Sequence, residues 1–316
     1  MNYQDRTTRI LVVIGLLLLL VGIVAAFFGP IEIYCFYLFS EGGRFHYEGF
    51  GFGSFMFGNI ACQIIGYYVI AIVAIPLGYG HLKVRRWARP LAVTLLWSWL
   101  VVGVPLTIIG LLILVTAKDL SLTAVLIAII LLALAYFAIP GLLIRFYQSR
   151  NVRATFEAQD PTLHWLETRP IPILVLCTLY VFYIVVLHIP IFFNGAFPLF
   201  GVFFFDLPGM FLLDVSILCL VPLAWGTLRS RRWAWWGALG YFLLMTLSSM
   251  MTLFKSSYSD ILAGMNFPPR EMEFLGGLPI QGSHFALLIG IPLLATLGVI
   301  IWSRRYFVRA DQALNG

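Results

Sequence analysis

The chain has 316 residues, of which 61% are hydrophobic and only 11% are charged, and its mean hydropathy is +0.96. Soluble globular domains carry about 25% charged residues, so the composition excludes a soluble domain and is typical of a membrane protein. The formal net charge of +6 calls for no nucleic-acid partner, because anionic lipid headgroups attract the same basic side chains.

Apolar runs long enough to cross a hydrocarbon core of about 30 Å recur along the whole chain. They are apolar on every face, which excludes the alternating strands of a β-barrel. The longest polar interval, about 145–170, is too short and too charged to form a domain with its own core. The predicted fold class is therefore an all-α, polytopic membrane helix bundle. We expect eight transmembrane helices, in chain order at residues 10–29, 57–79, 90–116, 121–144, 171–194, 208–228, 233–254 and 282–303.

Two larger loops connect these helices on one side. Residues 42–59 are rich in Gly and Phe and are predicted to form a packed loop or a shallow re-entrant turn. In the loop 255–280, Pro268 and Pro269 are expected to break any helix and leave a semi-rigid segment. Both loops are candidate surfaces for binding a partner on the outer side of the membrane. The alternative is that they only cap the helix bundle.

The basic residues indicate the orientation of the chain. Most Lys and Arg residues fall in loops on one side of the predicted membrane, and only Arg44, Lys118, Lys255 and Arg270 fall on the other. By the positive-inside rule both termini are then cytoplasmic, which requires an even number of spans. We expect an integral protein of the prokaryotic plasma (inner) membrane, with both its N- and C-termini in the cytoplasm.

A basic phrase that contains tryptophan occurs twice, as GHLKVRRWARP at 80–90 and as GTLRSRRWAWW at 226–236. Shorter matches pair Thr8-Arg9 with Thr168-Arg169 and residues 152–154 with 308–310. We interpret these matches as an internal repeat of two four-helix transmembrane units, 1–158 and 159–316, with the same orientation in the membrane.

The two phrases are predicted to anchor helix ends at the cytoplasmic interface, because Lys and Arg reach anionic headgroups and Trp lies at the membrane boundary. The glycine that begins each phrase is expected to close the preceding helix. The alternative is a basic docking surface for a cytoplasmic partner. The anchoring residues are Lys83, Arg85, Arg86, Trp87, Arg229, Arg231, Arg232 and Trp233.

Polar residues near the predicted outer leaflet form the candidate functional site. An ionisable group in the bilayer is costly unless it has a partner or water, so Asp214, which lies within an apolar run, is the most informative member. The alternative is that these residues reach water at helix ends or bond neighbouring helices. The candidate pocket comprises Asp214, His188, His284, Gln63, Asn59, Tyr67, Glu32 and Lys255.

No sequence pattern identifies a reaction. The H-E-x-x-H, G-x-S-x-G and P-loop patterns are absent. Of the histidines, only His188 and His284 could be brought together by two helices, and only near one leaflet. We therefore expect no haem and no other resident metal. The alternative is a zinc ion held by these histidines together with Asp214. The aromatic cluster FFFDLPGMFLLD at 203–214 is expected to pack, with a pocket for a lipid, quinone or pigment as the alternative.

Three functions stay open. The one we favour is a non-catalytic membrane subunit or scaffold that binds partner proteins or lipid through its helices and outer loops. We predict no cofactor, and the alternative is a bound lipid or other apolar molecule. The second is a permease for an apolar or lipid-like substrate, which the repeat and the prolines within helices favour. The third is a membrane enzyme with an outer-leaflet Asp/His site. Its chemistry would depend on Asp214 with His188 or His284.

A reporter fused after Gly316 tests the topology. Eight spans with cytoplasmic ends predict that the reporter is active and protected in the cytoplasm. A reporter that is accessible only from outside would contradict the even number of spans.

Overall fold

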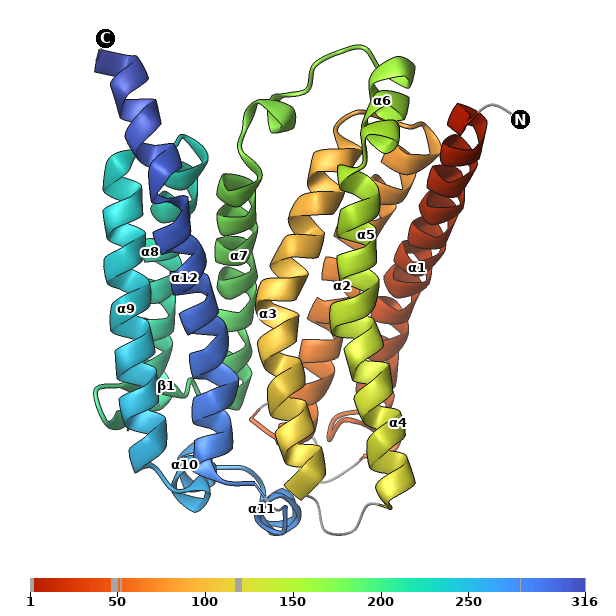
Figure 1. Cartoon of the computed structure of the whole chain (residues 1–316). Helices are drawn as coiled ribbons and strands as arrows, with labels where there is room; N and C mark the ends of the chain where they lie inside the picture. Colours follow the sequence, from red (N-terminus) through yellow and green to blue (C-terminus); the bar gives the residue numbers. More distant parts are fainter. Residues whose placement is uncertain (1–2, 47–50, 52, 117–120, 279, 316) are drawn as a thin grey trace. The chain divides into compact units, whose positions relative to one another are not determined.

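The computed structural model describes residues 3–46, 51, 53–116, 121–278 and 280–315 (Figure 1). Eight of its helices are long and apolar enough to cross a membrane, and each coincides with one predicted span. The all-α class and the eight-span prediction are therefore confirmed. Lys118, one of the four basic residues predicted on the outer side, lies outside the described residues.

The elements follow one another along the chain with short connections. Their bounds are α1 Tyr3–Phe39, α2 Phe55–Leu82, α3 Ala88–Thr116, α4 Leu122–Ala133, η1 Leu134–Ala138, α5 Ile139–Gln148, α6 Arg150–Gln159, η2 Trp165–Thr168, α7 Ile171–Leu187, η3 Ile189–Phe193, β1 Phe197–Leu199, β2 Val202–Phe204, α8 Asp206–Leu228, α9 Arg232–Lys255, α10 Tyr258–Met265, α11 Pro269–Gly276 and α12 Gly282–Asn315.

The first helix differs from its prediction in length. The first span was predicted to end at residue 29, but α1 continues through Pro30 to Phe39. Proline is tolerated inside transmembrane helices because neighbouring groups satisfy the backbone that it leaves unpaired. The fourth span is likewise continuous through α4, η1 and α5. Its π-helical segment η1 ends two residues before Pro140, which has no N–H to donate.

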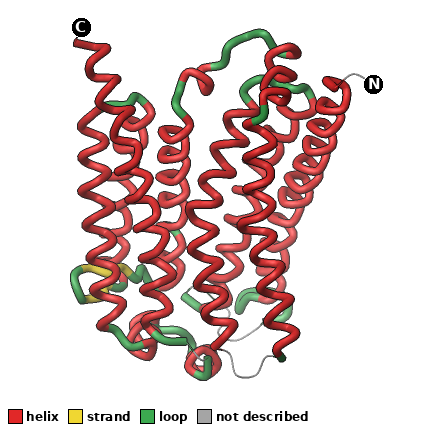
Figure 2. The backbone as a smooth tube through the Cα atoms, in the orientation of Figure 1, coloured by secondary structure: helices red, strands yellow, loops and turns green. Residues whose placement is uncertain are grey.

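Two loops contain structure that the sequence analysis did not predict. Between α7 and α8, the strands β1 and β2 form an antiparallel hairpin in which Phe197 pairs with Phe204 (Figure 2). In the loop 255–280, α10 ends at Met265 and α11 begins at Pro269. The proline pair therefore separates two helices as predicted, but Pro269 also starts one, because its fixed φ suits the first turn.

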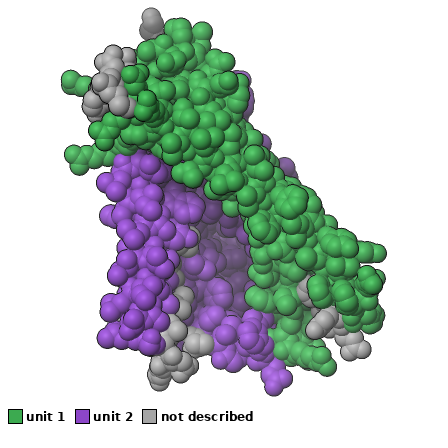
Figure 3. Space-filling model, turned by 90° about the vertical axis from the view of Figure 1, so that its right-hand side faces the viewer, with its two compact units in different colours: residues 1–93, 145–168, 267–271 green, residues 94–144, 169–266, 272–316 purple. Residues whose placement is uncertain are grey.

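The chain divides into two compact units, coloured separately in Figure 3. Unit 1 comprises residues 1–93, 145–168 and 267–271, and unit 2 comprises residues 94–144, 169–266 and 272–316. These units group residues by their packing, so the sequence repeat 1–158 and 159–316 stays a prediction.

Unit 1 is built on the close pairing of α1 with α2. A Cβ on Gly15 would lie 2.9 Å from the Leu82 amide nitrogen and 3.0 Å from the Gly78 carbonyl oxygen. Gly22 faces the backbone of Ile75 at a similarly short distance. Small residues that let two backbones approach are the usual basis of helix association in lipid. The helix α6 then packs on α1 and buries Phe156.

Unit 2 contains an antiparallel bundle of α7, α8, α9 and α12 (Figure 1). Its core is apolar and aromatic, with Tyr180 of α7 stacked on Phe242 of α9. Because the helices alternate in direction, the start of α7, the end of α8, the start of α9 and the end of α12 share one end of the bundle. We call this the arginine end, after Arg169, Arg229, Arg231, Arg232, Arg304 and Arg305.

The two repeated phrases adopt the same turn. The Arg85 amide donates to the Gly80 carbonyl at 2.6 Å, and the Arg231 amide donates to the Gly226 carbonyl at 2.9 Å. This 6→1 bond defines a Schellman motif, whose left-handed residue is normally glycine. Here Val84 and Ser230 occupy that position, with φ of 46° and 53°.

The predicted role of the glycine in each phrase was therefore wrong. Gly80 and Gly226 lie four residues before the left-handed residue, where a Cβ would meet the indole of Trp87 at 2.9 Å or that of Trp233 at 2.6 Å. Each glycine makes room for the tryptophan that folds back over the helix end.

Replacing Gly15 with Ala tests the α1–α2 pairing. The new methyl group meets backbone atoms that cannot move aside, so we expect a loss of about 1–3 kcal/mol in stability, seen as a lower Tm in detergent. Gly66→Ala on α2 is the matched control, because nothing lies within 4 Å of its Cβ position. Equal Tm values for the two variants would contradict the close packing.

Candidate functional site

Four of the predicted pocket residues lie in unit 2, and local contacts engage three of them. The His188 Nδ1 donates to the Ile184 carbonyl at 2.7 Å. The His284 Nδ1 accepts from the Gln281 amide at 3.2 Å at the start of α12. Lys255 lies beside Gly201 of the hairpin, and Asp214 is exposed on α8. Among the described interactions, none joins Asp214 to either histidine.

The other four predicted residues lie in unit 1. Tyr67 of α2 stacks on Phe28 of α1, with the ring centroids 5.7 Å apart. Gln63 and Glu32 are half-buried, and Asn59 is exposed. The face of α2 that carries Asn59, Gln63 and Tyr67 is thus partly directed toward α1, and the convergence of the full set stays a prediction.

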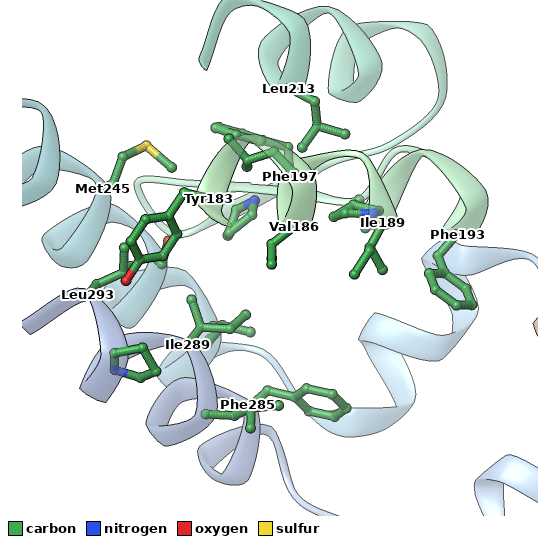
Figure 4. Close-up of a pocket in the computed structure, with 18 of the residues that line it drawn as sticks. Tyr183, Val186, Ile189, Phe193, Phe197, Leu213, Met245, Phe285, Ile289 and Leu293 are labelled. Atoms are coloured by element: carbon green, nitrogen blue, oxygen red, sulfur yellow. The ribbon is translucent and has the colours of Figure 1, made fainter. Parts of the chain in front are cut away.

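Unit 2 contains an apolar cavity of about 510 Å³ (Figure 4). It lies in the half of the α7–α8–α9–α12 bundle opposite the arginine end. Figure 4 shows Val186 and Ile289 facing the same space from α7 and α12. Its volume is within the range of sites for small molecules, which are also mostly apolar. The labelled lining residues are Tyr183, Val186, Ile189, Phe193, Phe197, Leu213, Met245, Phe285, Ile289 and Leu293.

The β-hairpin that contributes Phe197 to this cavity is held by polar side chains of α9. The Ser248 Oγ accepts from the Phe200 amide at 2.9 Å and donates to the Pro198 carbonyl at 3.2 Å. The Thr252 Oγ1 accepts from the Gly201 amide at 2.8 Å. Phe200 and Gly201 both have positive φ, as in the tight turns that match the twist of hairpin strands. These bonds place the hairpin against the cavity.

The lining offers little polar chemistry. The Tyr183 hydroxyl is hydrogen-bonded to Thr296 Oγ1 at 2.8 Å, and Thr296 in turn donates to the Pro292 carbonyl. Tyr241 and Ser249 carry the other side-chain hydroxyl groups among the described lining residues. None of Asp214, His188, His284 and Lys255 lines the cavity. The arrangement can surround an apolar molecule, and it presents no charged group to it.

No family model, curated protein or solved structure matches this chain. The site is therefore interpreted from its own geometry. Among the described residues, no group of three or more His, Cys, Asp and Glu side chains is arranged to hold a metal ion.

The cluster at 203–214 was expected to serve packing, and two of its residues pack in buried clusters and also line the cavity. Phe203 and Leu213 both face this space. Leu213 also packs in a buried cluster with Phe197 and Met245. The alternative of a pocket for a lipid, quinone or pigment stays a prediction. Phe205 of the same cluster packs closely against Gly264 of α10, so packing describes the remainder better.

The first repeated phrase lies in a network of ion pairs within unit 1. Arg86 pairs with Glu167, and its Nη2 lies 3.7 Å from Glu157. The Arg85 Nη1 lies 3.9 Å from Asp160, which also accepts from the Arg86 amide at 3.2 Å. Hydrogen bonds from Thr162 and from the Arg86 amide hold the pKa of Asp160 below its usual value. Lys83 is exposed, and Trp87 covers Gly80.

The second phrase has different surroundings in unit 2. The Arg229 guanidinium lies 4.1 Å from the centre of the Trp225 ring, and Arg231 and Arg232 are exposed. No acidic side chain that the structure describes forms an ion pair with any of these three arginines. Trp233 is also exposed. Among the described residues, acidic side chains thus pair with Arg85 and Arg86 of the first phrase and with no arginine of the second.

Sequence reasoning missed two sets of buried polar residues. His81, which was assigned to a loop, is fully buried, and its Nε2 accepts from the Tyr147 hydroxyl at 2.6 Å while Nδ1 donates to Leu77. Ser248 and Thr252 were not considered. Their spacing of four residues in an apolar run was the available signal, because it places both hydroxyls on one face of α9.

Asp160→Asn tests the ion-pair network of the first phrase. The wild-type carboxylate, whose pKa is lowered on folding, contributes stability that is present at neutral pH and is lost as the pH falls below about 4. We expect the variant to lose about 1 kcal/mol at pH 7 and to show a weaker decrease of Tm on acidification. The control is Glu157→Gln, which removes a more exposed carboxylate and should change Tm less. An Asp160→Asn profile parallel to that of the wild type would contradict this role.

Proposed function

We propose that the protein is a non-catalytic integral membrane protein that binds a lipid or other apolar molecule in the cavity of unit 2. The carrying observation is the cavity itself, which has about 510 Å³ and a mostly aliphatic and aromatic lining from α3, α7, η3, β1, β2, α8, α9, α10 and α12. A space of this size left empty would forfeit the dispersion contacts of its walls. An apolar occupant from the surrounding bilayer restores them.

The positions of the ionisable residues favour binding over catalysis. An enzyme of the Asp/His type needs its groups close together near the substrate. In unit 2, His188 and His284 are each engaged with their own helix ends, and Asp214 is exposed away from the cavity lining. A catalytic role for Asp214 therefore has no geometric support among the described residues.

The charge of unit 2 supports an orientation for the cavity. Under the positive-inside rule, the arginine end of unit 2 faces the cytoplasm. In unit 1 the basic residues Arg6, Arg9, Lys83, Arg85 and Arg86 likewise share the end that contains the start of α1 and the end of α2. We propose that the cavity lies in the outer half of the membrane and that both termini are cytoplasmic. The prokaryotic plasma membrane and the binding of partner subunits stay predictions.

Transport of the bound molecule is the second candidate, and Pro292 favours it. This proline lies inside α12 and lines the cavity. Because it removes one backbone hydrogen bond, it gives α12 a place to bend next to the ligand. A permease would use such a bend to open the cavity, whereas a binding protein would hold it fixed.

Filling the cavity tests the proposed function. In the variant Val186→Trp, the indole should fill part of the cavity and leave too little room for the ligand. We expect it to lower the retention of a fluorescent single-chain fatty acid by at least about tenfold. Val181→Trp is the matched control, since Val181 lies on the same helix with 56% of its surface exposed. Retention should be measured on detergent-purified protein of verified Tm. Equal retention by both variants would contradict binding in the cavity.

A further inference from the structure

A small notch between the start of α9 and the end of α12 combines two arginines with a tryptophan-rich wall. It has a volume of about 20 Å³ and is lined by Arg232, Trp235, Trp236, Arg304, Phe307 and Val308. It lies at the arginine end of unit 2, opposite the cavity that carries the proposed function. We infer that this notch binds the phosphate group of an anionic phospholipid.

The charge balance around the notch calls for an anion. The Arg304 guanidinium lies 5.6 Å from the centre of the Trp235 ring, and the side chains of Arg232 and Arg304 are both exposed. Neither forms an ion pair with an acidic residue in the part of the chain that the structure describes. The equivalent turn in unit 1 carries Asp160, Glu157 and Glu167 as partners. In unit 2 no described acidic side chain takes that place, and an anion from the membrane can do so.

The shape of the notch suits a phosphate attached to lipid chains. A volume of about 20 Å³ holds one or two groups the size of water, which matches phosphate oxygens and leaves the rest of the headgroup in solution. The Trp235 indole is fixed, because its Nε1 donates to the Ile300 carbonyl at 2.8 Å. Phe307 and Val308 add an apolar wall for the glycerol and the first part of an acyl chain. Basic pockets between transmembrane helices bind phospholipid headgroups in this manner.

The exposed tryptophans place the notch at the depth of the headgroups. Trp225, Trp233, Trp236 and Trp302 are each about half exposed and lie at the arginine end of unit 2. Tryptophan is enriched at the boundary between hydrocarbon and headgroups. An anion bound between Arg232 and Arg304 is thus at the level at which a phospholipid presents its phosphate. This proposal does not depend on the occupant of the apolar cavity.

Native mass spectrometry of the full-length protein in detergent tests the site. The probes are phosphatidylglycerol and phosphatidylcholine with identical acyl chains, and inorganic phosphate. We expect the wild type to prefer phosphatidylglycerol. The double variant Arg232→Gln/Arg304→Gln should bind this lipid about 25-fold more weakly, because each arginine near an anionic surface contributes about fivefold to binding. Arg232→Lys/Arg304→Lys, which keeps the charge, should retain most of the binding and shows that the site tolerates substitution.

The matched control is Arg231→Gln/Arg305→Gln, which removes the same charge from the same end of unit 2 but from outside the notch. It should keep the preference for phosphatidylglycerol. Equal losses in both Gln variants would overturn the site in favour of a diffuse positive surface. Equal binding of phosphatidylcholine, or displacement of the lipid by millimolar inorganic phosphate, would also overturn it. Val186→Trp should leave the preference unchanged, which separates this site from the cavity.

Discussion

The structure depends on one constraint, which is that backbone N–H and C=O groups in hydrocarbon must find partners within the protein. The long helices meet it through their own hydrogen bonds. The hairpin between α7 and α8 cannot meet this constraint alone, because its two short strands leave the backbone N–H groups of the turn without partners. Ser248 and Thr252 of α9 supply the missing partners. Two hydroxyl groups on one helix therefore allow irregular backbone to close one side of the apolar cavity.

Hydropathy was sufficient to predict the eight spans, because the energy of burying about twenty apolar residues in lipid exceeds most local preferences. It failed where local preference and tertiary context disagree. The first span was predicted to end at residue 29, yet α1 continues through Pro30 to Phe39. The hairpin was missed because FPLFGVFFF contains no polar alternation to mark strands. The glycines of α1 read as ordinary apolar residues, although their spacing sets the contact with α2.

The site was harder to predict for a different reason. A cavity is a space left between elements, and the residues around it are of the same types as those in a packed core. Its lining joins residues from Val102 to Leu293, so the periodicity within any one helix does not reveal it. The same applies to charge. Arg86 and Arg232 occupy equivalent places in identical turns, but Glu167 neutralises only the former among the described contacts.

The length of the first two helices has a consequence for the membrane itself. Helix α1 has 37 residues and α2 has 28, so they extend about 55 Å and about 42 Å, against a hydrocarbon thickness of about 30 Å. Most of α1 from Ile10 to Phe39 is apolar. Because glycine contacts join the two backbones, the helices must relieve this hydrophobic mismatch together, by a common tilt or by thickening the adjacent lipid. Unit 1 would then favour regions of bilayer thicker than the average.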